Sequence, residues 1–153
     1  MKKINRIFIA MLSLFTGAQI YSMDQGQMNP EELGEVLYYA VLSGDTKRVR
    51  AALDAAADAN VNWQVTQEAI DRPDGRLTQL DAGSCPLSCA VCRKKNLEMV
   101  ELLLERGANP NIVIRNGDAP LLLAIRTNNL KMMRLLLAAG ADPNIVIEDG
   151  STP

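Results

Sequence analysis

Apolar residues recur at helical spacing in two segments of the second half of the chain. They stand at Leu97, Val100, Leu103 and Leu104 in the first segment, and at Leu130, Met133, Leu136 and Leu137 in the second. Positions spaced in this way fall on one face of an α-helix. The pattern predicts an amphipathic helix in each segment, with Leu104 and Leu137 at equivalent inward positions.

A shorter apolar run precedes each segment and predicts a shorter helix. The runs begin at Pro86 and Pro120. Proline suits the first turn of a helix, because its missing N–H would have no helical partner there. Polar turns at residues 94–96 and 128–129 follow the two runs. Each long helix is therefore predicted to pair with the short helix just before it.

The two predicted helix pairs are copies of one unit. Gly107 opens the run Gly-Ala-Asn-Pro-Asn-Ile-Val-Ile, and Gly140 opens Gly-Ala-Asp-Pro-Asn-Ile-Val-Ile 33 residues later. Glycine directly after a helix commonly adopts the left-handed conformation that stops it. Asn116-Gly117 then predicts a tight turn that returns the chain to the next unit. A register kept over a full period indicates a repeat architecture.

A weaker copy lies upstream. Asn29 and Pro30 predict the start of its first helix. Near its end, Ala57, Asp58 and Asn60 align with Ala141, Asp142 and Asn144. We expect a repeat domain over residues 29–153, in units of about 33–62, 83–113 and 117–146, with a fourth unit starting at 147–153. Residues 63–82 are an insertion, read as a hairpin or as a loop folded over the units.

The sequence resembles the ankyrin-repeat family. The resemblance rests on the paired Gly-Ala-Asx-Pro-Asn runs, on Cys85-Pro86-Leu87-Ser88 and Ala119-Pro120-Leu121-Leu122 in place of the family's Thr-Pro-Leu-His, and on Asp149-Gly150-Ser151-Thr152-Pro153. It implies an all-α fold, a solenoid of helix-turn-helix units joined by β-hairpin-type loops. The Thr and His of the family tetrapeptide are missing from all three complete units.

The resemblance also implies that partners contact the loop tips and the outward side of the first helices. Transferred residue by residue, the candidate contacts are Asp81, Ser84, Cys92, Arg93, Arg115, Asn116, Asp118, Arg126 and Thr127. The alternative for each one is solvated surface, since a minority of interface residues carries most binding energy. Trp63, the only tryptophan, is read either as a binding hot spot or as a residue that packs on the repeat core.

Three cysteines, Cys85, Cys89 and Cys92, fall near one face of a predicted helix. A structural metal site would want a fourth ligand, and the chain has no histidine. Disulfide geometry between neighbours on one helix is awkward. We therefore expect small packing residues, with Cys92 as the candidate for an exposed free thiol.

Composition narrows the function further. Apolar residues make up 48% of the chain and aromatic residues 4%, so the core must be aliphatic. The absence of histidine removes the usual general base near neutral pH and the commonest metal ligand. Phosphate loops, nucleophile elbows and metal motifs are also missing from the sequence. We expect no enzyme activity, no cofactor and no metal.

Residues 1–22 predict an export signal peptide. Lys2, Lys3 and Arg6 precede an apolar run that is too short for a comfortable membrane span. Without this segment the chain carries 13 basic and 18 acidic residues, a net charge of −5, which argues against nucleic acid and anionic membranes. The expected location is periplasmic or secreted, with no membrane contact beyond the export signal.

The sequence therefore predicts an exported module that binds a protein partner, such as a host or envelope protein, through the concave face and loop tips of stacked repeats. The alternative is the N-terminal targeting or regulatory part of a larger enzyme or effector. The sequence does not identify the partner.

Overall fold

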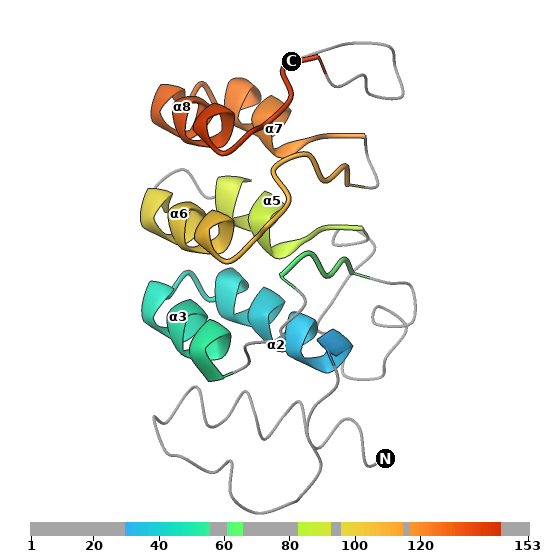
Figure 1. Cartoon of the computed structure of the whole chain (residues 1–153), viewed down its shortest axis with the longest axis vertical. Coiled ribbons are helices and arrows are strands. Elements are labelled where there is room, and N and C mark those ends of the chain that lie inside the picture. Colours follow the sequence, from blue (N-terminus) through green and yellow to red (C-terminus); the bar gives the residue numbers. More distant parts are fainter. Residues whose placement is uncertain (1–29, 56–60, 66–82, 93–95, 115–116, 145–153) are drawn as a thin grey trace, which may run out of the picture.

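The described residues form a stack of three helix pairs. The structure is a computed structural model of the whole chain, and it describes residues 30–55, 61–65, 83–92, 96–114 and 117–144. Figure 1 shows the first helix of each pair in one column and the second helix in another. The pairs are α2 (Pro30–Leu42) with α3 (Thr46–Ala55), α5 (Pro86–Cys92) with α6 (Leu97–Glu105), and α7 (Pro120–Arg126) with α8 (Leu130–Ala138). The predicted all-α repeat fold is confirmed.

Local chemistry sets the helix ends where the sequence predicted them. Helices α5 and α7 begin at Pro86 and Pro120. The Asn129 side chain caps α8 by accepting the Met132 N–H at 3.1 Å. Gly140 after α8 has φ of +90°, and a Cβ there would meet nothing within 4 Å. The backbone conformation, and not a lack of space, therefore favours glycine at this helix stop.

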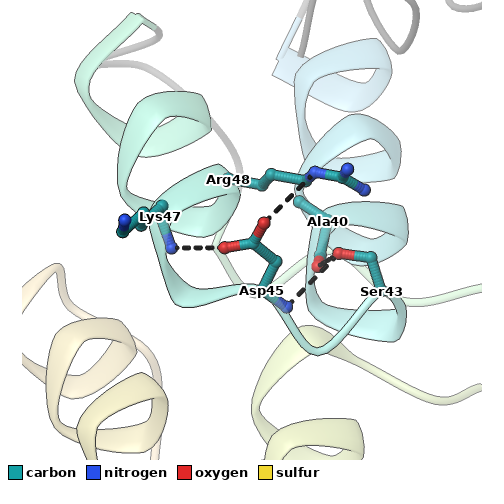
Figure 2. A network of polar contacts seen from close by, with 5 residues as sticks. All are labelled: Ala40, Ser43, Asp45, Lys47 and Arg48. Atoms are coloured by element: carbon teal, nitrogen blue, oxygen red, sulfur yellow. Dashed lines mark hydrogen bonds and ion pairs between the residues drawn. The ribbon is translucent and has the colours of Figure 1, made fainter. Parts of the chain in front are cut away.

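The turn between α2 and α3 is held by its own side chains (Figure 2). Ser43 Oγ donates to the Ala40 carbonyl at 2.6 Å and so caps the end of α2. Asp45 Oδ1 accepts the Lys47 N–H at 2.9 Å at the start of α3, and Asp45 Oδ2 lies 3.3 Å from Arg48 Nε. These contacts satisfy backbone groups that a helix end leaves without helical partners.

One aliphatic core runs through all three pairs. Leu103 and Leu136 are fully buried at equivalent places in α6 and α8, and so is Met132. The prediction that Leu104 and Leu137 point inward was wrong for Leu137, which is 46% exposed, whereas Leu104 is half-buried and packs against the core. Adjacent residues on a helix point about 100° apart. The fully buried positions are Leu103 and Leu136, one residue before Leu104 and Leu137.

Hairpin-type backbone hydrogen bonds occur in the connections between the units. In the second loop, the Gly117 N–H donates to the Ile114 carbonyl at 2.8 Å, and the Ile114 N–H donates to the Asp118 carbonyl at 3.1 Å. In the first loop, Val65 exchanges similar bonds with Gly83 and Ser84, both at 2.9 Å. Val65 therefore belongs to the repeat loop, so the insertion starts after it. Residues 66–82 lie outside the described residues.

An asparagine in each of these loops ties its unit to the next. Asn111 Nδ2 donates to the Gly140 carbonyl at 3.0 Å, and its Oδ1 accepts the Asp142 N–H at 2.7 Å. Asn62 makes the same two bonds to Gly107 and Asn109, at 3.3 and 2.7 Å. The structural equivalent of Asn111 in the first unit is therefore Asn62, and the sequence alignment that used Asn60 was wrong by two residues.

Cys85 and Ser88 form a local cap where the family has threonine and histidine. The Cys85 N–H donates to Ser88 Oγ at 3.0 Å, and Ser88 Oγ donates to the Cys85 carbonyl at 2.9 Å. The Ser88 N–H contacts Cys85 Sγ at 3.4 Å. Both side chains are buried. The second unit thus satisfies the first turn of α5 without the family residues.

Candidate functional site

The ends of the first helices and the second hairpin bring three predicted contact residues together. Arg126 ends α7, and Cys92 ends α5 at the equivalent place in the preceding unit. Asp118 lies at the base of the hairpin, just before α7. Arg126 Nη1 lies 2.7 Å from Asp118 Oδ2. We call Cys92, Asp118 and Arg126 the Arg126 patch.

The ion pair in this patch joins an exposed guanidinium to a buried carboxylate. The Arg126 side chain is 64% exposed, whereas the Asp118 side chain is buried. A carboxylate removed from water is stabilised by charged or hydrogen-bonding partners. Asp118 therefore holds the Arg126 guanidinium, while most of the Arg126 side chain stays exposed to solvent. Such a fixed arginine can meet a carboxylate or carbonyl group at little further cost in side-chain entropy.

Cys92 is exposed and free, as the sequence predicted. Partial desolvation raises the pKa of its thiol; the Asp118 carboxylate raises it further, while Arg126 acts in the opposite direction. Burial raises the pKa of the Cys85 thiol as well. A raised pKa disfavours the thiolate, which is the nucleophilic form. The Cys92 thiol is therefore less ready to form a thiolate than a free cysteine.

Thr127 and Ser84 serve the fold in the structure. Thr127 Oγ1 donates to the carbonyls of Leu123 and Ala124 at 2.9 and 3.1 Å and so closes the end of α7. Ser84 is half-buried, and its carbonyl accepts the Val65 N–H in the first hairpin. The Thr127 hydroxyl and the Ser84 carbonyl therefore make hydrogen bonds within the fold.

The family follows from a comparison with known proteins. Residues 37–147 match the family profile described as ankyrin repeats (3 copies). The chain belongs to the ankyrin-repeat family. Over 46 residues it is 50% identical to the human (Homo sapiens) protein named transient receptor potential cation channel subfamily A member 1. This match covers 30% of the chain and 4% of that protein. Ankyrin repeats are generally protein–protein interaction modules, and they are typically non-catalytic.

Trp63 lies inside this ankyrin-repeat stack rather than on its surface. Its side chain is 5% exposed, and its ring meets Tyr38 edge to face at a centroid distance of 5.7 Å. Val65 completes the buried cluster, and Cys89 Sγ donates to the Tyr38 hydroxyl at 3.4 Å. Of the two interpretations of Trp63, burial supports packing on the repeats and corrects the binding hot spot: the ring packs against Tyr38 of α2, and its apolar area is buried.

Four of the candidate contact residues lie outside the described residues: Asp81, Arg93, Arg115 and Asn116.

The sequence did not single out two exposed apolar features of the ankyrin stack. Val113, in the second hairpin, is 41% exposed, and its carbonyl accepts a hydrogen bond from Gln64 Nε2 at 3.1 Å. Ile125 in α7 and Leu130 at the start of α8 are exposed on the last described helix pair. Helical spacing marks Leu130 as part of an apolar face, but exposure depends on which neighbour covers that face.

In the described ranges, histidine, cysteine and acidic side chains do not gather in groups of three or more that could hold a metal ion. Within the same ranges, every helix is too short or too polar to cross a membrane.

Proposed function

We propose that this ankyrin stack binds a protein partner through its concave face and loop tips, with the Arg126 patch as the centre of contact. The observation that carries the proposal is the exposed Arg126 guanidinium held by the buried Asp118 carboxylate. Arginine is enriched among residues that dominate binding energy. Its free donors suit an acidic or carbonyl-rich partner surface.

The test is a comparison of two glutamine variants as baits. Arg126→Gln removes the charge while leaving an amide that can still donate to Asp118. Arg50→Gln removes an exposed arginine from α3, in the other column of helices, and is the matched control. Proteins recovered by cross-linking and pull-down are quantified by mass spectrometry. A partner kept by Arg50→Gln and reduced by about tenfold or more with Arg126→Gln supports the proposal.

The rate at which Cys92 is alkylated is an independent measure of whether a partner covers the same surface. Because its thiol is exposed beside Arg126, a bound partner should slow its alkylation by a maleimide in the otherwise unmodified chain. If both baits recover the partner equally and Cys92 labelling is unchanged in the complex, the partner binds to another surface.

We further propose that the protein is exported with removal of residues 1–18 or 1–22. The support is the basic start at Lys2, Lys3 and Arg6 followed by a short apolar run. N-terminal sequencing of protein collected outside the cytoplasm tests the proposal. Intact Met1 on protein that remains in the cytoplasm would contradict it.

A further inference from the structure

We draw no further inference here: the strongest candidate, the row of side chains that Leu42, Cys92 and Arg126 form at the ends of α2, α5 and α7, belongs to the surface already proposed to bind a partner, and nothing in the described residues shows which further partner chemistry it selects.

Discussion

Asn111 joins the second unit to the third by donating from Nδ2 to the Gly140 carbonyl at 3.0 Å. Its Oδ1 also accepts the Asp142 N–H at 2.7 Å, so one side chain satisfies both kinds of backbone group just past the end of α8. Asn62 repeats this arrangement one unit earlier. The asparagine bonds therefore fix the spacing of the loops from one unit to the next.

Asn111→Ala should lower the free energy of unfolding by about 1–2 kcal/mol, because two hydrogen bonds between units are lost. Asn144 stands at the equivalent place in the third unit and is exposed. Asn144→Ala is therefore the matched control, with an expected change within about 0.5 kcal/mol. Urea unfolding followed by circular dichroism gives both values. Equal losses in the two variants would mean that the asparagine acts within its own loop.

Leu136→Ala and Leu137→Ala change neighbouring residues of one helix in opposite environments. Leu136 is fully buried, so its truncation should cost about 2–5 kcal/mol through the cavity that remains. Leu137 is 46% exposed, and its truncation should cost less than about 1 kcal/mol. Chemical denaturation of the two variants measures the difference. A larger loss for Leu137 would show that this side chain is covered in solution.

Trp63→Ala should cost about 3–5 kcal/mol, because it removes a buried ring that meets Tyr38 edge to face. Trp63→Phe retains most of the apolar area and should cost less. Since Trp63 is the only tryptophan, its fluorescence reports this site alone. Its emission should be blue-shifted in the folded chain and move to longer wavelength on unfolding. Solvent-exposed emission from the folded chain would contradict the burial of this ring.

The three cysteines should react in order of exposure. Cys92 is exposed, Cys89 is half-buried and Cys85 is buried, so a thiol reagent should modify Cys92 first and Cys85 only after unfolding. Mass spectrometry of partly alkylated protein identifies the order. Rapid modification of Cys85 under native conditions would contradict the packing at the start of α5.

The pH dependence of Cys92 labelling reports the ion pair. Desolvation and the Asp118 carboxylate raise the pKa of this thiol, and Arg126 lowers it. Asp118→Asn should therefore shift the labelling profile to lower pH, and Arg126→Gln should shift it to higher pH. Stopped-flow alkylation across alkaline pH measures both shifts. Movement of the two profiles in the same direction would show that changed solvent access, and not charge, controls the thiol.

Features set by short-range geometry were predictable from the sequence. Pro86 and Pro120 mark helix starts because proline fixes φ, and Gly107 and Gly140 mark helix stops because few other residues adopt a positive φ there without strain. The 33-residue period then implied that similar units stack. Cys92 and Arg126 became candidate contacts through the resemblance to the ankyrin-repeat family, and the structure places them at equivalent ends of α5 and α7.

The tertiary structure alone decided what each side chain meets. Leu136 and Leu137 both satisfy helical spacing, and only the packing of α8 on its neighbours buries one and exposes the other. The sequence around Trp63 could not show that its ring packs against Tyr38, which lies 25 residues upstream. The pairing of Asp118 with Arg126 likewise needs a hairpin and a helix end to meet. The sequence determined the unit and its period because these depend on backbone conformations of neighbouring residues. Burial and charge pairing required the tertiary structure, because they depend on contacts between segments far apart in the chain.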